Sequence, residues 1–204
     1  MSIRDLQDVF NVDENVNKSL TLFHAHMLNG CKKLNLVSRR DVNRTLTELI
    51  KDSLQVLNWS DCRLASPVLD IGTGGGFPGM PLKLVKPELN LYLLDANRRK
   101  CNFLEITRQN FQMENVHIIN QRVEDLIATG DYQHFFSTII SRATATTDTL
   151  LIWAKELLQT GGELILWKGS ALEDELSKAD LDGWSPVEQF DFGKEVRLVK
   201  IVKL

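Results

Sequence analysis

A run of glycines is the clearest chemical feature of the sequence. It stands in the stretch PVLDIGTGGGFPG at residues 67–79, where a short apolar segment leads into a turn and then a helix-like segment. Glycine has no Cβ, so its backbone can approach a ligand closely and adopt φ angles that are closed to other residues. In open α/β sheets, ligands bind at such turns, outside the carboxyl ends of the strands. The stretch therefore predicts a loop, shaped by Gly72, Gly74 and Gly76, on which a flat polar ligand lies.

Acidic residues follow the next two apolar segments. LYLLD ends in Asp95, 23 residues after Gly72, and NQRVEDL contains Val123 and Glu124. In nucleoside-binding folds, a carboxylate at the position of Asp95 accepts hydrogen bonds from the ribose hydroxyls. Glu124 and the N–H of Val123 would then stand where an adenine ring extends. The alternative is that the glycines only form a tight turn and Asp95 only caps a helix; two acids at one predicted edge favour the ligand site.

Two cofactors fit this geometry. Gly74, Gly76 and Gly79 match the GxGxxG pattern of a dinucleotide pyrophosphate site, although a single match of this kind is weakly specific. Asp70 directly before the loop and Pro78 inside the pattern favour S-adenosylmethionine, and so does the predicted hairpin at the end of the chain. The sequence therefore predicts an S-adenosylmethionine-dependent methyltransferase, with a dinucleotide-dependent dehydrogenase as the distant alternative.

Alternating elements would hold these residues at one edge of a sheet. Residues 13–34 and 41–57 carry apolar side chains at spacings of three and four, which predicts two amphipathic helices. After them, short β-branched runs alternate with helix-length segments, which is typical of βαβ units and a parallel sheet. The predicted strands are 67–72, 89–95, 116–119, 135–141 and 163–169, and the predicted helices are 81–86, 97–111, 123–128, 145–158 and 171–180.

The end of the chain departs from this alternation. VEQFDF and EVRLVKIVKL are joined through Gly193 and Lys194, a connection too short for a helix and suited to a hairpin. We therefore predict an α/β fold with a doubly wound, mostly parallel, seven-stranded sheet of the Rossmann-like class I methyltransferase kind that ends in an antiparallel hairpin. Residues 1–63 would form an N-terminal helical extension, and residues 64–204 the S-adenosylmethionine-binding methyltransferase domain.

Composition and charge narrow the class of protein. The 204 residues are 43% hydrophobic and 25% charged, which suits a folded globular chain. A formal net charge of -3 excludes a uniformly basic nucleic-acid binder but allows a local basic face. Three widely separated cysteines predict reduced thiols rather than a disulfide framework. No apolar run suits a signal peptide or a membrane span, so we expect a cytoplasmic protein without a membrane partner.

The sequence resembles the RsmG (GidB) methyltransferases, which modify guanine N7 in 16S ribosomal RNA. The matching pieces cover nearly the whole chain: LNLVSRRD at 34–41, KDS at 51–53, DIGTGGGFPGMPL at 70–82, RKCNFL at 99–104, RVED at 122–125, SRA at 141–143 and KG at 168–169. Their order and spacing together are specific. The resemblance and the reading of the loop imply cofactor contacts at Gly72, Gly74, Gly76, Phe77, Asp95, Ala96, Val123, Glu124 and Arg142.

Two positions depart from the family pattern. Leu49 stands where the family usually has a histidine, three residues before the Asp52–Ser53 pair. Val196 and Arg197 stand where an Arg–His pair is expected before the last strand. Neither position belongs to the glycine loop, so the expected cofactor is unaffected.

The target atom that the resemblance implies sets the chemistry. Guanine N7 has a free lone pair and no proton, so direct in-line attack on a sulfonium methyl group needs no general base, and alignment and electrostatics carry the reaction. The four histidines show no metal-like spacing, and we expect no metal ion. Polar residues expected to position the base or its phosphates are Asn35, Arg40, Asp52, Ser53, Arg122 and Lys168.

Basic residues gather in two places that would suit RNA phosphates. They are Lys32, Lys33, Arg39, Arg40 and Arg44 between the first two predicted helices, and Arg98, Arg99 and Lys100 at the start of a later one. We expect 16S ribosomal RNA, or a small-subunit assembly particle, as the partner, and infer no obligate protein partner. The rival hypotheses are a methyltransferase of the same fold that acts on a metabolite or a protein, and a catalytically silent nucleotide- or RNA-binding module.

Overall fold

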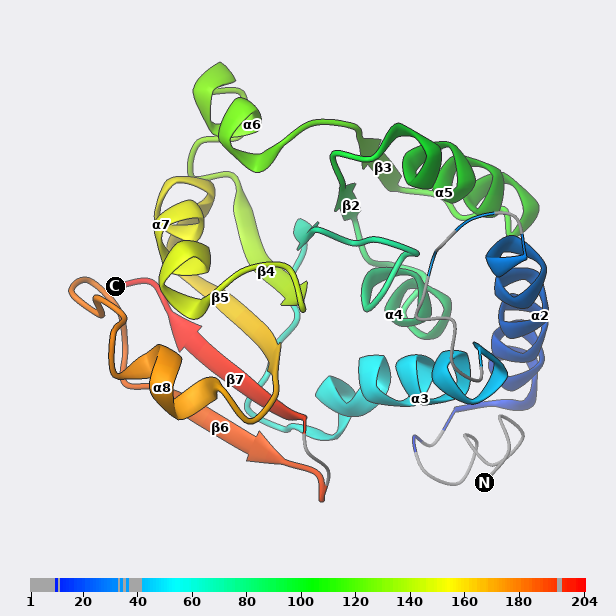
Figure 1. Ribbon diagram of the computed structural model, residues 1–204, viewed down its shortest axis with the longest axis horizontal. Coiled ribbons are helices and arrows are strands. Elements are labelled where there is room, and N and C mark those ends of the chain that lie inside the picture. Colours follow the sequence, from blue (N-terminus) through cyan, green and yellow to red (C-terminus); the bar gives the residue numbers. More distant parts are fainter. Residues whose placement is uncertain (1–9, 11, 33, 35, 37–41, 194–195) are drawn as a thin grey trace.

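The computed structural model describes residues 10, 12–32, 34, 36, 42–193 and 196–204 (Figure 1). The helices are α2 (Glu14–Cys31), α3 (Val42–Leu54), α4 (Gly79–Val85), α5 (Arg98–Asn110), α6 (Val123–Thr129), α7 (Thr147–Leu157) and α8 (Leu172–Leu176), with the 3-10 helix η2 (Gln55–Asn58) after α3. The strands are β1 (Val68–Ile71), β2 (Leu91–Leu94), β3 (Val116–Ile119), β4 (Phe136–Arg142), β5 (Leu158–Lys168), β6 (Glu188–Asp191) and β7 (Arg197–Val202).

One seven-stranded sheet forms the centre of the molecule. Its strand order is β3-β2-β1-β4-β5-β7-β6. The pairs β1–β2, β1–β4, β2–β3 and β4–β5 are parallel, while β5–β7 and β6–β7 are antiparallel. The predicted fold class, a mostly parallel sheet that ends in an antiparallel hairpin, is therefore confirmed. Residues 194 and 195 of the predicted hairpin turn lie outside the described part of the chain.

Helices cover both faces of the sheet, and each face has its own apolar core (Figure 1). Neighbouring strand residues point to opposite faces. Val68 of β1 therefore belongs to the core shared with α2, α3, α4 and α5, whereas Leu69 belongs to the core shared with α6, α7 and α8. This two-sided burial explains why the parallel strands read as unbroken apolar runs.

The N-terminal helices pack into the first of these cores. Asp13 caps α2 by accepting a hydrogen bond from the backbone N–H of Val16 at 2.8 Å, as expected for a predicted helix that starts there. Leu20 and Phe23 of α2 and Leu46 of α3 are fully buried in the same cluster as Val68 and other strand residues. The apolar faces of α2 and α3 therefore pack in the core on the face of the sheet to which Val68 points.

Several element boundaries differ from the predictions. The first helix ends at Cys31 rather than near residue 34, and residue 41, where the second predicted helix starts, lies outside the described residues. The strand predicted to begin at residue 163 begins at Leu158, which pairs with Phe136, so Gly161 and Gly162 lie within β5. The helix predicted over 171–180 covers only Leu172–Leu176, and the chain then turns so that Trp184 becomes buried.

The parallel register aligns the carboxyl ends of four strands. Ile71 of β1 pairs with Leu94 of β2 and with Ser141 of β4, and Leu94 pairs with Ile119 of β3. The segments that follow these strands therefore meet at one edge. Within the described residues, no helix is long and apolar enough to cross a membrane. The three cysteines are free thiols, as predicted.

Candidate functional site

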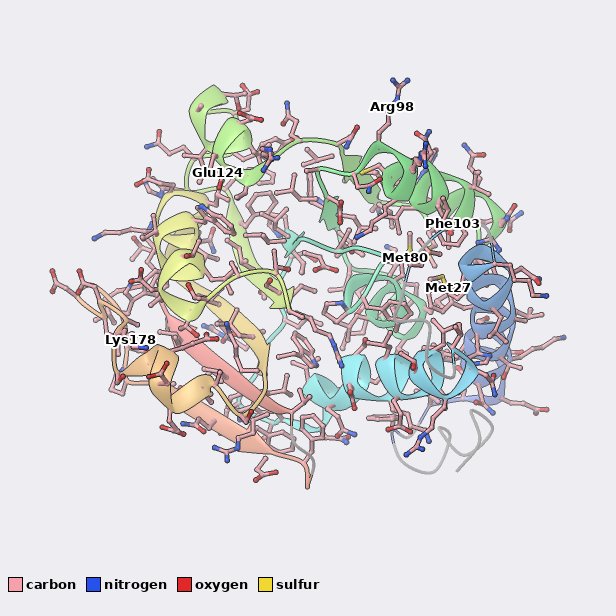
Figure 2. All side chains as sticks on the ribbon, in the orientation of Figure 1. Met27, Met80, Arg98, Phe103, Glu124 and Lys178 are labelled. Carbon is pink, nitrogen blue, oxygen red and sulfur yellow. The ribbon has the colours of Figure 1, made fainter. Side chains whose placement is uncertain are left out.

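A cleft of about 180 Å³ opens at the carboxyl ends of β1, β2 and β3. Six predicted residues line it, from three separate segments: Gly72, Asp95, Ala96, Arg122, Val123 and Glu124. The other lining residues are Ile71, Leu94, Gln121, Thr144 and Trp153. Figure 2 shows Glu124 on α6 at one side of this region, while Arg98 extends outward from the start of α5. The fold thus brings together the glycine turn and both acidic segments singled out in the sequence.

Asp95 joins the end of β2 to the glycine loop. Its Oδ2 accepts a hydrogen bond from the backbone N–H of Gly74 at 2.9 Å, and its Oδ1 accepts one from the N–H of Asn97 at 2.8 Å. Asn97, not Asp95, is the N-cap of α5, since its side chain accepts from the N–H groups of Arg99 and Lys100. A carboxylate has about four lone-pair sites, so Asp95 retains capacity to accept from hydroxyl groups of a ligand.

Asp70 holds the base of the same loop. Its Oδ2 accepts from the hydroxyl of Thr73 at 2.8 Å and from the N–H of Gly79 at 2.9 Å. The side chain is fully buried, and its Oδ1 has no hydrogen-bond partner within the described part of the chain. Burial raises the pKa of Asp70 to about 7, against the opposing effect of these two hydrogen bonds. The carboxyl group of Asp70 therefore connects Thr73, inside the loop, with Gly79, at its end. Its pKa lies close to neutral pH.

Two loop glycines are required by space as well as by backbone conformation. Gly72 has φ +69°, and a Cβ built on it would lie 2.3 Å from the side chain of Thr144. Gly76 has φ +96°, and a Cβ there would lie 2.7 Å from Met80. Real Cβ atoms do not tolerate such distances, so a larger residue would push the loop out of place. The space at the Cβ position of Gly72 is already filled by Thr144, and that at Gly76 by Met80.

Phe77 lies under the loop rather than in the cleft. Its ring is buried and meets Phe23 of α2 edge to face, with ring centroids 5.9 Å apart. Neither Phe77 nor Gly74 nor Gly76 is among the residues that line the cleft. Their predicted contacts with a cofactor remain predictions, and the structure gives Phe77 a clear packing role between α2 and the loop.

Arg142 ends β4 on the other side of Gly72 and pairs with a residue of α3. Its Nη2 donates to Oδ2 of Asp52 at 3.0 Å, and the side chains are 17% and 6% exposed. The indole N–H of Trp167 donates to the backbone carbonyl of Asp52 at 2.7 Å, while the hydroxyl of Ser53 donates to the carbonyl of Leu49. The predicted residues Asp52 and Arg142 therefore meet, but outside the 180 Å³ cleft.

Lys168 has a different surrounding from the one expected of a substrate-binding group. Its ammonium group donates to Oε2 of Glu175 at 2.7 Å and to the carbonyl of Ala145 at 2.9 Å. The same Glu175 oxygen accepts from the N–H and the hydroxyl of Thr147. This network joins the end of β5 to the segment after β4 and to the start of α7. Its evident effect is to hold the loop after Arg142.

Some residues that line the cleft carried little signal in the sequence. Thr144 follows the SRA piece and contacts Gly72, with its hydroxyl donating to the carbonyl of Ile71 at 3.0 Å. Trp153 reaches the cleft from the middle of α7, where nothing in the helical pattern distinguishes it from a core residue. Arg122 lines the rim and is exposed. Asn35 and Arg40 lie outside the described residues, so their predicted roles are untested.

A larger groove of about 440 Å³ lies between α2 and α5, and its mostly apolar lining includes Phe103, Ile106 and Leu34. None of the described residues predicted to bind the cofactor or to position the base lines it, although Arg99, from the basic group at the start of α5, does. The 180 Å³ cleft, which has the acidic residues and the glycine turn, is therefore the better candidate. In the described ranges, no group of three or more His, Cys, Asp or Glu residues is arranged to hold a metal ion.

Known proteins resemble this chain in their structure and, more closely, in their sequence. Similar solved structures include an S-adenosylmethionine-dependent O-methyltransferase from Thermotoga maritima, with a TM-score of 0.60 and 14% identity over 76% of this chain and 65% of that chain. An O-methyltransferase from Agrobacterium tumefaciens, described as predicted, has a TM-score of 0.56 and 15% identity over 67% of this chain and 73% of that chain. At such low identity this similarity shows the fold alone, which is that of class I methyltransferases.

Sequence relatives are closer. A ribosomal RNA small subunit methyltransferase G from Carboxydothermus hydrogenoformans is 37% identical over 78% of this chain and 67% of the relative. One of the same name from Caldanaerobacter subterraneus is 34% identical over 74% of this chain, which spans only 64% of that relative's length. The family GidB, described as rRNA small subunit methyltransferase G, matches residues 16–187. With that match and these identities, the chain belongs to the GidB family.

Proposed function

We propose that the protein is an S-adenosylmethionine-dependent methyltransferase that methylates N7 of a specific guanine in 16S ribosomal RNA. The observation that carries the proposal is the cleft in which Asp95, tied to the glycine loop, stands beside Val123 and Glu124. Membership of the GidB family and the class I fold support the same conclusion. Because the chain spans about two thirds of its relatives' length, their activity is carried over here as a proposal.

The residues present fit S-adenosylmethionine. Asp95 has lone pairs left for the ribose hydroxyls, and Glu124 and the N–H of Val123 are available to the adenine. Gly72 has no side chain and lines the cleft with its backbone, which is available to the rest of the ligand. We further propose that Gly74, Gly76, Ala96 and Phe77 shape this site without all contacting the cofactor. When bound, the cofactor supplies an electrophilic methyl group on a sulfonium.

The protein's contribution to the reaction is orientation. Among the described residues that line the cleft there is no histidine, cysteine or lysine, and we assign the two carboxylates, Asp95 and Glu124, to the adenosine, so no lining group is left over for a general base. That composition suits a nucleophile such as guanine N7, which needs no deprotonation. The loop after β4 is fixed by Thr144, Lys168 and the pairing of Arg142 with Asp52. Rigid placement of the two reacting groups is then the main source of rate.

RNA binding requires a local positive surface on a protein whose net charge is -3. Arg98 and Arg99 are exposed at the start of α5, close in the chain to Asp95, and Arg122 is exposed at the rim of the cleft. We propose that these arginines contact phosphates near the target base. A base inside folded RNA must first be exposed, so the substrate is a loop of the free RNA or of a small-subunit particle in the cytoplasm.

The decisive experiment is transfer of labelled methyl groups from S-adenosylmethionine to 16S ribosomal RNA that lacks this modification, as free RNA and as assembled small subunits. We expect one labelled guanine, methylated at N7, when the product is digested and mapped. Cofactor binding without any transfer to RNA would keep the fold and overturn the substrate. Transfer to a small molecule or a protein in place of RNA would identify a different methyltransferase of this fold.

A further inference from the structure

We propose that the indole ring of Trp153 contacts one face of the adenine of S-adenosylmethionine, so that this side chain supplies much of the protein's affinity for adenosine-containing ligands. No motif in the sequence singles out Trp153, which lies in the middle of α7. The inference rests on the proposed cofactor, and it adds how the base of that cofactor is held. It also predicts that ligand binding changes the fluorescence of one particular tryptophan.

The first argument is the place of Trp153 in the cleft. Its side chain lines the same small cleft of about 180 Å³ as Val123 and Glu124, and it packs against the apolar core that contains Val123. Val123 is the first residue of α6, and α6 packs against α7, as Figure 1 shows. Because we assign the N–H of Val123 and the carboxylate of Glu124 to the edge of the adenine, the ring of Trp153 lies beside the proposed position of that base.

The second argument is the apolar surface that the cleft offers to a flat ring. Hydrogen bonds reach only the edge of an adenine, and its two faces need apolar or aromatic contacts. Ile71, Leu94 and Val123 line the cleft but are only 1%, 2% and 6% exposed, so little of their surface is open to a ligand. Ala96 is exposed but offers one methyl group. Trp153 is half-buried, and it is the only aromatic residue among the described residues that line the cleft.

The third argument is that the ring of Trp153 is not engaged as other tryptophans of the chain are. Trp59 stacks on Phe190 with ring centroids 5.6 Å apart, and the indole N–H of Trp167 donates to the carbonyl of Asp52. Within the described ranges, no aromatic ring stacks on Trp153 and no acceptor binds its indole N–H. That N–H is not among the buried groups that lack a partner, so it reaches solvent. The ring is therefore available to a ligand without the loss of an existing contact of this kind.

A contact on the adenine has a defined effect on the reaction. The adenine is remote from the sulfonium, so its contact with Trp153 is equally strong before and during methyl transfer. An interaction of this kind lowers KM for the cofactor and leaves kcat unchanged. S-adenosylhomocysteine, the product, carries the same adenosine and gains from the same contact. A ring that only packs α7 against α6 would not act on the affinity for adenosine in this selective way.

The test follows tryptophan fluorescence while S-adenosylhomocysteine, adenosine or methionine is added to the full chain, with affinities measured in parallel by calorimetry. For the wild-type protein we expect S-adenosylhomocysteine and adenosine to quench the fluorescence and methionine to have no effect. Trp153→Phe keeps an aromatic face, so it should bind S-adenosylhomocysteine within about threefold of the wild-type affinity but lose most of the fluorescence change. Trp153→Ala should raise the dissociation constant about tenfold or more, as for loss of a base-stacking contact. Its kcat at saturating cofactor should stay within about twofold of the wild-type value.

The chain offers two matched controls. Ile152 precedes Trp153 on α7, is 60% exposed and does not line the cleft, so Ile152→Ala should keep the wild-type affinity and fluorescence change. Trp184 is buried and pairs with Lys203 after the end of β7, at the edge of the sheet opposite to the cleft. Trp184→Phe should therefore keep the fluorescence change on binding, although it also removes one indole.

The outcomes separate this inference from the proposed function. If Trp153→Phe binds S-adenosylhomocysteine and keeps the full fluorescence change, or if Trp153→Ala binds it as tightly as the wild-type protein, the ring does not contact the adenine and the inference is overturned. A lower melting temperature of Trp153→Ala with unchanged affinity would show a packing role alone. If the wild-type protein binds no S-adenosylhomocysteine, the proposed cofactor fails and the inference with it. If it binds the cofactor but methylates no 16S RNA, only the proposed substrate fails.

Discussion

At the scale of single residues, two aspartates near the glycine loop have different environments and different roles. Asp95 is tied to Gly74 at the mouth of the cleft and keeps acceptor capacity for a ligand. Asp70 is fully buried below the loop and bonds Thr73 and Gly79. The sequence places both next to the loop, but only their burial and partners distinguish the carboxylate that we propose to bind the ligand from the structural one.

Replacing Asp95 should weaken cofactor binding. Asp95→Asn keeps the size of the side chain but substitutes a donor for one acceptor oxygen, so a ribose hydroxyl loses its partner. We expect the dissociation constant of S-adenosylmethionine to rise about tenfold or more, measured by calorimetry. Asp125→Asn is the control, because Asp125 is exposed on α6 beside Glu124 and does not line the cleft. Equal affinity of Asp95→Asn and the wild-type protein would exclude the ribose contact.

Asp70 should make stability depend on pH. Its pKa is raised from 3.8 to about 7 by burial, so the folded protein retains a proton that the unfolded chain releases. This contribution to the free energy of unfolding is complete below about pH 4 and is lost as the pH rises through about 7.

The comparison variant is Asp70→Asn, which has no titrating group and keeps an oxygen for Thr73 and Gly79. In urea unfolding between pH 5 and 8, the wild-type protein should lose stability relative to Asp70→Asn as the pH rises. Parallel stability curves for the two proteins would show that Asp70 is already ionised across this range.

At the scale of elements, the turn from β1 to α4 depends on the loop that follows β4. Gly72 is in the left-handed region and touches Thr144, so the two turns are packed against each other. Ala143, next to Thr144, also has a positive φ of 53°, which is unusual for a residue with a side chain. Strained backbone of this kind gathers at ligand sites. The pairing of β1 with β4 in parallel register is what brings the turns together.

Two glycine variants separate the effect of backbone strain at a positive φ from the effect of a steric clash between a Cβ and Thr144. Gly72→Ala forces a Cβ to within 2.3 Å of Thr144, whereas Gly130, with a similar φ of +73°, has nothing within 4 Å of its Cβ position. We expect Gly130→Ala to cost about 1 kcal/mol of stability with unchanged cofactor affinity. Gly72→Ala should lower the melting temperature further and weaken S-adenosylmethionine binding at least about tenfold. Similar cofactor affinity in the two variants would argue against this packing.

At the scale of the whole molecule, the N-terminal helices and the methyltransferase sheet share one apolar core. Phe23 of α2 contacts Phe77 below the glycine loop and also Phe111 after α5. The sequence divides at residue 63 into a helical part and an alternating part, and that division remains a proposal about organisation. The shared core predicts that the two parts unfold together rather than one at a time.

Truncating Phe23 tests this coupling. Phe23→Ala removes a fully buried ring and should cost about 3–5 kcal/mol. We expect a single unfolding transition by circular dichroism and by tryptophan fluorescence, together with weaker cofactor binding because Phe77 loses a neighbour. Leu22→Ala on the same helix is the control, since Leu22 is 56% exposed and should change little. Two separate transitions would show that the helical part folds independently.

The sequence by itself determined the kind of fold and the edge at which the site lies. Helical spacing before residue 63 and alternating apolar runs after it predicted the helices and the mostly parallel sheet, because burial on one face or on two leaves a pattern in the chain. The glycine turn, Asp95 and Glu124 follow successive strands, and parallel strands bring their carboxyl ends together. Those local rules need no knowledge of distant contacts.

The tertiary structure decided which polar residues meet and what they do there. Asp52 and Arg142 are 90 residues apart and form an ion pair, Phe77 packs on α2, and Lys168 is held by Glu175. Trp153 reaches the cleft from the middle of a helix. No periodicity encodes such contacts, because they depend on how helices settle on the sheet. Residues far away in the chain determine whether a charged side chain is available to bind a ligand or forms an ion pair that stabilises the fold.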